Sequence, residues 1–332
     1  MNRRRLLFGG LVSAAVVGAV YAYALPQLAG YASVWRVVGE LGGWWILALL
    51  AVTAVDLLTY ALPWLVALPG LRLPDAVRMT QASTAFSLVM PGGAPLGMAA
   101  SFAMLRSRGF SRSAVTSAVA LTGLWSQVST FLFPVVGLGL LAAEGTVSAL
   151  LRLLAGVGLS IAVLLVGVVV GVLWRAGFAA RVGDRAAGVA SRVRGLARRA
   201  PVGWNGDALV QYRGELLVLL RRRWGSLTAA TLANQLTGYV MLELSIRAVG
   251  IDRHHVAVAE SFAAWSIGRL IGSLPITPGG LGVVELGLTG TLVGFGGPSV
   301  RVVAAVLVYR VLSFVPTLVL GLLATLTWRR RT

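Results

Sequence analysis

The chain has 332 residues, of which 57% are hydrophobic and only 12% charged, and its mean hydropathy is +0.84. A soluble domain carries roughly 25% charged residues. The apolar residues also form runs of about 20, which is the length of a membrane-spanning helix. The composition therefore excludes a soluble enzyme, a disordered chain and a fibrous protein, and it indicates a polytopic membrane protein.

The chain carries 29 basic and 11 acidic residues, for a formal net charge of +18, and every one of the 29 is Arg. Most of the Arg lies in short segments between apolar runs, as expected of loops retained on the cytoplasmic side. This distribution explains the charge without nucleic acid as a partner. Cysteine is absent, which excludes disulfides, thiol catalysis and cysteine-based metal sites.

The first apolar run, Leu6–Leu25, follows three consecutive Arg residues. It is about 20 residues long, whereas the core of a signal peptide has roughly 7–15. We expect a retained first span that starts in the cytoplasm, with residues 1–42 holding this span and an external loop. A cleaved signal peptide, with its cleavage site at Ala22–Ala24, is the alternative.

Residues 43–142 form the first of two similar units, and their first apolar run leads inward and ends at Leu68. Residues 76–105 are apolar but are interrupted at Pro91–Gly97, and neither piece reaches the ~20 residues that a span needs. Because Arg108 follows, both ends of this segment lie on the cytoplasmic side, which predicts a re-entrant hairpin. The rest of the unit is a span that leads outward.

Residues 143–174 are predicted to hold a connecting span that returns inward. The longest polar stretch follows, at residues 175–224, and it contains 11 Arg. Within it, apolar residues recur at spacings of three and four between Phe178 and Leu196, which predicts an amphipathic helix. Such a helix, with Arg on its polar face, suits an anionic membrane surface. We interpret the stretch as a cytoplasmic linker between two halves, with a regulatory or lipid-gathering role as the alternative.

Residues 225–332 form the second unit, with a span to Val249, an interrupted segment at 256–296 and a final span from Val300 to Trp328. The predicted fold is therefore an all-α polytopic protein of the cell membrane, with six full spans, two re-entrant (broken) helical hairpins and both termini in the cytoplasm. The positions that report this topology are Arg108, Arg194 and Arg330, expected to be cytoplasmic, and Glu144 and Arg253, expected to be external.

Two features recur at one constant offset along the chain. Pro91-Gly92-Gly93 and Pro278-Gly279-Gly280 are 187 residues apart, and so are Asp56 and Glu243, the acidic residues inside the first span of each unit. One copy begins outside and the other inside, which predicts an inverted repeat. Inverted repeats with broken helices that meet near the membrane midplane are a design of transporters, and the interrupted segments point to the binding site.

Broken helix leaves unpaired backbone groups, which cost several kcal/mol each in lipid unless protein or a polar cavity surrounds them. The helix that follows the second break presents free N–H groups and a positive dipole end, which suit a phosphate. Charged residues inside apolar segments indicate function or an ion pair. We expect Arg269 and Arg310 to bind the phosphate, and Glu285 to hold these Arg side chains or receive an amino headgroup.

The predicted headgroup site contains no catalytic residue, metal or cofactor, and it consists of Arg269, Pro278, Gly279, Gly280, Gly282, Glu285, Arg310, Pro91, Gly92, Gly93, Asp56 and Glu243. Structural roles are open for three of these residues. Glu285 could only stabilise the dipole at the start of a helix, and Asp56 and Glu243 could only pair with Arg or cap freed backbone groups.

The segment Leu274–Glu285, with its Pro-Gly-Gly-Leu-Gly-x-x-Glu core, resembles the transmembrane domain of the lysylphosphatidylglycerol synthases, a flippase-like family of integral membrane proteins. Tyr309-Arg310 with Ser313 and Pro316 resembles the family's following helix, and Met90–Gly93 followed by Phe102–Gly109 resembles its first-half motif. The chain departs from the family at the inserted Ala94-Pro95 and at Thr122-Gly123, where many relatives carry a charged pair. The resemblance implies a stand-alone member without the synthase domain, and a membrane domain that flips lipid headgroups.

The favoured function is a flippase or scramblase that moves a phospholipid, an aminoacylated lipid or a lipid-linked headgroup across the membrane. Its partners would be membrane lipids with an anionic or phosphate-bearing headgroup. An intramembrane transferase acting on a lipid-linked substrate and a secondary transporter of a small anion are the alternatives, and a purely structural subunit is the residual one. An intramembrane protease is disfavoured, because Asp56 is the only Asp in a predicted span and no His lies in one.

Overall fold

The computed structural model describes residues 30–89, 93–143, 174–196, 205–274 and 277–328, together with single residues or pairs between 160 and 172 and at 203. The predicted first span, the break at Pro91-Gly92 and most of the connecting span lie outside the described residues. Every regular element in the described part is helical. The elements are α3 (Tyr31–Gly39), α4 (Gly43–Thr59), α5 (Leu62–Ala67), α6 (Leu73–Val89), α7 (Gly93–Ser107), α8 (Arg112–Ala143), α10 (Ala176–Leu196), α11 (Gly206–Ala248), α12 (Val258–Gly272), η2 (Pro278–Gly280), α13 (Val283–Gly294) and α14 (Ser299–Thr327).

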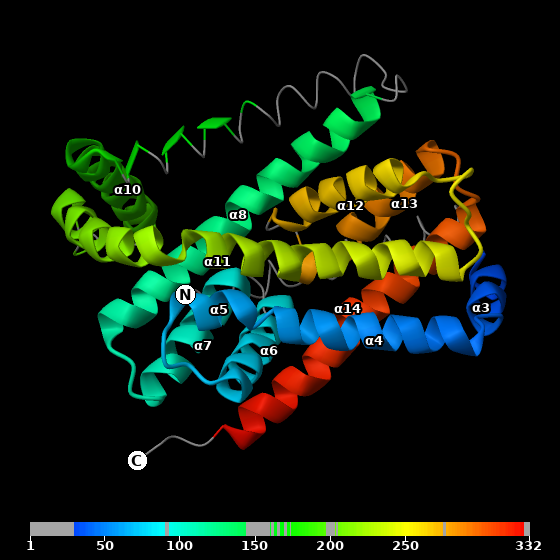
Figure 1. Cartoon of the computed structure of the whole chain (residues 1–332), viewed down its shortest axis with the longest axis horizontal. Coiled ribbons are helices and arrows are strands. Elements are labelled where there is room, and N and C mark those ends of the chain that lie inside the picture. The colour runs from blue at the N-terminus through cyan, green and yellow to red at the C-terminus, as the bar shows by residue number, and fades with distance from the viewer. Residues whose placement is uncertain are drawn as a thin grey trace.

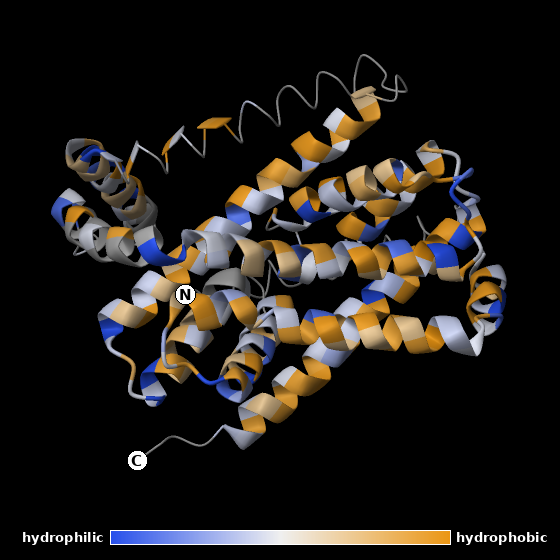
Figure 2. Cartoon of the chain, viewed as in Figure 1, coloured by the Kyte–Doolittle hydropathy of each residue, from blue (hydrophilic) through white to orange (hydrophobic). Residues whose placement is uncertain are grey.

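Within the described residues, three segments are long and apolar enough to cross a membrane, namely Gly43–Ala67, Arg112–Ala143 and Ser299–Thr327. They correspond to three of the predicted spans. Figure 2 shows that hydrophobic residues dominate the surfaces of the long helices α4, α8 and α14, whereas hydrophilic residues gather on α10 and at the loop before α12. The prediction of an all-helical membrane protein is thus confirmed, while the number of spans and the re-entrant paths stay predictions.

Two of the predicted apolar runs differ in detail from the helices that contain them. The run after Gly43 is divided into α4 and α5, and Pro63 lies in the first turn of α5, where its missing N–H is tolerated. The run that ends at Val249 belongs to the 43-residue helix α11, which begins at Gly206. The predicted boundary at residue 224 therefore falls inside one helix, because Arg is a good helix former and does not end a helix.

The two interrupted segments each form a pair of neighbouring helices. The first consists of α6 and α7, and the second consists of α12 and α13 with η2 between them. Figure 1 shows the α6–α7 pair below α11 and the α12–α13 pair above it, toward the other end of the molecule. Small residues allow close packing inside each pair: Gly97 lies against Ser87, and Gly268 lies against Leu288.

The packing between the two units is reciprocal. The last helix of each unit packs against the first hairpin helix of the other, so that α8 contacts α12 and α14 contacts α6. The first helices, α4 and α11, lie side by side (Figure 1). Exchanging the elements of one unit for those of the other leaves these contacts unchanged, which is the pattern that two units related by a two-fold axis require.

Glycines make the reciprocal contacts close. Gly137 of α8 leaves no room for a side chain, because a Cβ there would lie 2.9 Å from the Cα of Ala263 on α12. Gly321 of α14 lies in the same way against Ala85 and the backbone of Gln81 on α6. Helices in lipid associate through such close backbone approach, since no hydrophobic effect drives them together.

The inverted topology predicts which ends of the units share a side of the membrane. Arg112, the first residue of α8, and Arg253, in the loop before α12, are both exposed. Single Arg112→Cys and Arg253→Cys substitutions in this cysteine-free chain should be labelled by a membrane-impermeant maleimide from opposite sides, with Arg112→Cys labelled only after the membrane is opened. Labelling of both positions from one side would contradict the inverted repeat.

Candidate functional site

A cavity of about 320 Å³, lined by apolar surface and by many residues with hydroxyl or amide groups, lies between the first unit and helices α11 and α12. Its size is at the lower end of the range for small-ligand sites, so it fits a headgroup better than a whole lipid. Two aromatic side chains, Tyr60 and Trp64, contribute to one wall. The remaining lining is rich in hydroxyl and amide groups, which come from Thr80, Ser83, Thr84, Ser87, Ser101, Thr122, Ser126, Thr231, Asn234 and Gln235.

Several of the lining hydroxyls donate their hydrogen to the carbonyl three or four residues earlier in their own helix. Ser83 donates to the carbonyl of Thr80 at 3.1 Å, Ser87 to that of Ser83 at 3.0 Å, and Thr122 to that of Ala118 at 2.8 Å. This bonding satisfies the hydroxyl donor in an apolar helix. It leaves the oxygen lone pairs available as acceptors for a ligand in the cavity.

Arg269, near the end of α12, is the only charged side chain that the described residues contribute to the cavity lining. Its guanidinium lies 5.5 Å from the ring of Trp265, and within the described part it forms no hydrogen bond or ion pair. Two further lining atoms, Thr231 Oγ1 and Asn234 Nδ2, are buried and also lack a partner among the described residues.

Arg310 has a different environment from Arg269. Its Nε donates to Oε1 of Glu285 at 2.7 Å, its Nη2 donates to the carbonyl of Gly279 at 3.1 Å, and its guanidinium lies 4.2 Å from the ring of Phe314. The Glu285 side chain is completely buried, and its Oε2 accepts the N–H of Gly282 at 2.7 Å. The pair therefore ties α14 to the break and caps the first turn of α13.

The break itself requires glycine. Gly279 has a φ of +60°, and a Cβ at that position would lie 2.8 Å from the Cδ2 of Leu88 and 2.9 Å from the ring of Phe314. An L-residue with a side chain would be strained in this conformation and would also collide with its neighbours. The contact with Leu88 places the second break against the end of α6. The first break follows directly, but its Pro91 and Gly92 lie outside the described residues, whereas Gly93 begins α7.

Asp56 and Glu243, the two acidic residues 187 positions apart, both form hydrogen bonds with polar partners. Thr237 on α11 donates to Oδ1 of Asp56 at 2.8 Å, and the hydroxyls of Thr237 and Thr59 lie 3.0 Å apart. Asp56 therefore connects α4 to α11. Its charge also acts on Arg269 without a direct ion pair, so Asp56 lies behind the cavity rather than in its lining.

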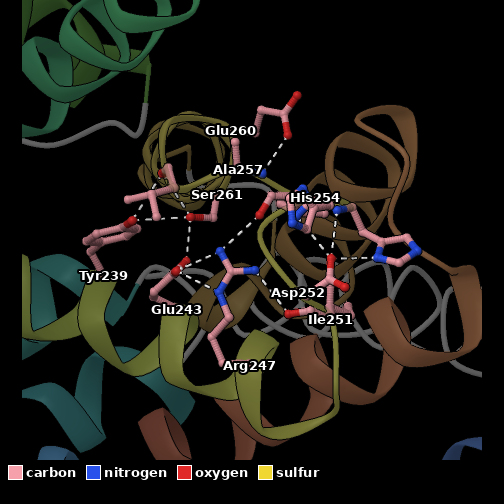
Figure 3. A network of polar contacts seen from close by, with 12 residues as sticks. Tyr239, Glu243, Arg247, Ile251, Asp252, His254, Ala257, Glu260 and Ser261 are labelled. Carbon is pink, nitrogen blue, oxygen red and sulfur yellow. Dashed lines mark hydrogen bonds and ion pairs between the residues drawn. The ribbon is translucent and has the colours of Figure 1, made fainter.

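Glu243 belongs to a separate network at the start of α12 (Figure 3). Its Oε1 lies 2.7 Å from Nη2 of Arg247, and its Oε2 accepts the hydroxyl of Ser261 at 2.6 Å. Arg247 also donates to the carbonyls of Ile251 at 3.0 Å and Val256 at 2.9 Å. Glu243 thus helps to hold the loop between α11 and α12 in place.

The same loop carries the adjacent histidines (Figure 3). Oδ1 of Asp252 lies 2.7 Å from Nδ1 of His255 and accepts the backbone N–H groups of His254 and His255, each at 3.0 Å. Hydrogen bonding from the His255 side chain lowers the pKa of the Asp252 carboxyl below its usual value. The described residues contain no group of three or more acidic, His or Cys side chains that could hold a metal.

The structure thus separates the predicted site residues into groups. It brings Arg310, Glu285, Gly279 and Gly282 together at the break, places Arg269 in the cavity, and puts Asp56 and Glu243 in two other networks. The hydroxyl and amide lining is absent from the sequence-based site. Its signal was present, because Thr80, Ser83, Thr84 and Ser87 recur at helical spacing within an otherwise apolar segment.

Comparison with known families shows to which protein family the chain belongs. The family model for the lysylphosphatidylglycerol synthase TM region matches residues 7–321. The chain belongs to this family. The match confirms the resemblance inferred from the Pro-Gly-Gly-Leu-Gly core, and it covers the first unit, the linker and the second unit up to residue 321. No curated protein matches the chain. This family member is therefore a membrane protein linked to lipid handling.

Proposed function

We propose that the protein translocates a phospholipid across the cell membrane by passing its phosphate-bearing headgroup through the polar cavity, while the acyl chains stay in the lipid. Arg269 binds the phosphate, and Thr231 and Asn234 add hydrogen-bond donors. In this proposal both termini are cytoplasmic, and the two hairpins enter the membrane from opposite faces.

The observation that carries the proposal is a guanidinium in the lining of a polar cavity, without an ion pair or hydrogen bond from the described residues. An ionised side chain inside a membrane protein is costly, and it is retained where it meets a substrate or an ion. Guanidinium is the side-chain group whose donors match the oxygens of a phosphate. Membership of a lipid-linked family makes a lipid phosphate the favoured source of that anion.

Cavity filling provides a direct test. Gly123 on α8 lines the cavity, and nothing lies within 4 Å of a Cβ added there, so the backbone position accepts a side chain and we expect Gly123→Phe to occupy part of the cavity. Gly139 on the same helix has equally open surroundings but does not line the cavity, which makes Gly139→Phe the matched control. The assay uses proteoliposomes with phosphatidylglycerol that carries a fluorophore on its acyl chain. External dithionite bleaches only lipid in the outer leaflet, so probe that starts in the inner leaflet is bleached only after it has been translocated. We expect this bleaching with wild type and with Gly139→Phe.

We expect Gly123→Phe to bleach only the outer leaflet, as protein-free liposomes do. Equal bleaching in wild-type and protein-free liposomes would overturn lipid translocation, and full activity of Gly123→Phe would place the path elsewhere. A second arm uses liposomes loaded with labelled inorganic phosphate. Release of this phosphate without lipid movement would instead support the transport of a small anion.

A further inference from the structure

We infer that the headgroup taken by this cavity is an anionic phosphodiester that carries a polyol, such as glycerol or a sugar, and not an aminoacylated or zwitterionic headgroup. This inference rests on the proposed function and names its substrate class. It follows from the complete set of charged and hydrogen-bonding groups that the described residues place around the cavity.

The charge in the cavity selects an anion. Arg269 is the only ionised side chain in the described lining, so a headgroup with one negative charge neutralises it, whereas an ammonium group would be repelled. A buried ammonium group needs a carboxylate or an aromatic cage. The described lining contains no carboxylate, and its two aromatic side chains, Tyr60 and Trp64, share the cavity with the guanidinium of Arg269, which repels an ammonium group.

Most of the acidic residues that could supply such a carboxylate have partners outside the cavity. The chain has only 11 acidic residues. Asp75 pairs with Arg108 at 2.7 Å, and Glu285 pairs with Arg310 at the same distance. The acids that form ion pairs or hydrogen bonds outside the cavity are Asp75, Asp184, Asp207, Glu243, Asp252, Glu260 and Glu285. Asp56, whose charge interacts with that of Arg269, accepts a hydrogen bond from Thr237 behind the lining.

The neutral lining selects hydroxyl groups. Side chains from α6, α7, α8 and α11 present hydroxyls and amides, and those of Ser83, Ser87 and Thr122 already donate to backbone carbonyls. Their free lone pairs accept hydrogen bonds from hydroxyl groups of a ligand. A headgroup that ended at a bare phosphate would leave most of these acceptors unused, and buried polar groups without partners are costly.

The division of the cavity follows from these contacts. The phosphate subsite is assigned to Arg269, with Thr231 and Asn234 of α11 in the same lining, because Arg269 is the only charged residue in the described lining. The hydroxyls of α6 and α7 form the polyol subsite on the hairpin. A glycerol and an inositol or other sugar share this chemistry, so the hairpin wall recognises the class rather than one lipid.

A headgroup panel in proteoliposomes tests the inference. The probes are phosphatidylglycerol, phosphatidylinositol, phosphatidylcholine, phosphatidylethanolamine and lysyl-phosphatidylglycerol, each with the fluorophore on an acyl chain. We expect phosphatidylglycerol and phosphatidylinositol to move at least about tenfold faster than the other three, since each of those places an uncompensated positive charge in the cavity. The two polyol arms show whether glycerol or a larger polyol is preferred.

A change in the charge of the cavity lining should change the relative rates at which the lipids are translocated. Gln235→Glu, nearly isosteric, adds a carboxylate to the lining that contains Arg269 and should raise lysyl-phosphatidylglycerol movement relative to phosphatidylglycerol by about tenfold or more. Gln127→Glu is the matched control, because Gln127 is exposed on α8 and does not line the cavity. The ratio of two lipids in one preparation is independent of how much protein has folded.

The results of these experiments test the substrate class and the proposed translocation function separately. Movement of a lysyl or zwitterionic lipid as fast as that of phosphatidylglycerol in wild type would overturn the substrate class and leave lipid translocation intact. An unchanged lipid ratio in Gln235→Glu would overturn the assignment of the cavity as the selective site. Failure of every lipid to move faster than in protein-free liposomes would overturn the proposed function itself.

Discussion

Replacing Arg269 with Gln should lower phospholipid translocation in proteoliposomes by at least about 30-fold, because removing one partner of a buried charge–charge contact costs roughly 2 kcal/mol or more. The same substitution should lower the thermal unfolding temperature of the purified protein only slightly, since Arg269 forms no ion pair or hydrogen bond within the described residues and loses only its contact with the ring of Trp265. Large loss of transport with normal stability is the signature of a substrate-binding group.

Two further variants sharpen the Arg269 experiment. Arg269→Lys keeps the charge but loses the planar fork, so we expect a transport rate between those of wild type and Arg269→Gln. Arg253→Gln removes one positive charge from an exposed loop position and controls for the net charge of the protein. A transport rate close to wild type in Arg269→Gln would show that the headgroup does not bind at Arg269.

The sequence predicted the layout of the fold better than the partners of its charged residues. Pro and Gly marked the second break, where η2 separates α12 from α13, because those residue types interrupt a helix wherever the chain places them. The partner of an Arg depends instead on how helices pack. Arg269 and Arg310 are equally plausible phosphate ligands in the sequence, and only the path of α14 past the break brings Arg310 to Glu285.

The cavity could not be predicted from the repeat, since the two units share a layout but not a lining. At the offset of 187 residues, Ser83 and Ser101 in the first hairpin correspond to Leu270 and Leu288 in the second. Leu288 is buried in the core beside Trp265, whereas Ser83 and Ser101 line the cavity. Hydroxyl side chains bonded to their own helix are also compatible with a dry interior, so the pattern alone did not distinguish a packed core from a polar cavity.

The Arg310–Glu285 pair should affect stability far more than transport. Arg310→Met leaves a completely buried carboxylate without its cation, so we expect the free energy of unfolding to fall by about 3–5 kcal/mol. Adding Glu285→Gln removes that charge, and its side-chain carbonyl can still accept the N–H of Gly282. The double variant should therefore be more stable than Arg310→Met alone, with a coupling free energy of about 1–3 kcal/mol.

The comparison of stability with transport distinguishes the two roles open to the pair. Unfolding of the purified single and double variants in detergent gives the coupling free energy, and the proteoliposome assay gives the translocation rate per folded protein. If the pair only braces the break, the double variant should retain most of its translocation, in contrast to Arg269→Gln. A double variant that is as stable as wild type but as inactive as Arg269→Gln would instead indicate that Arg310 binds the headgroup and acts together with Arg269 on the phosphate.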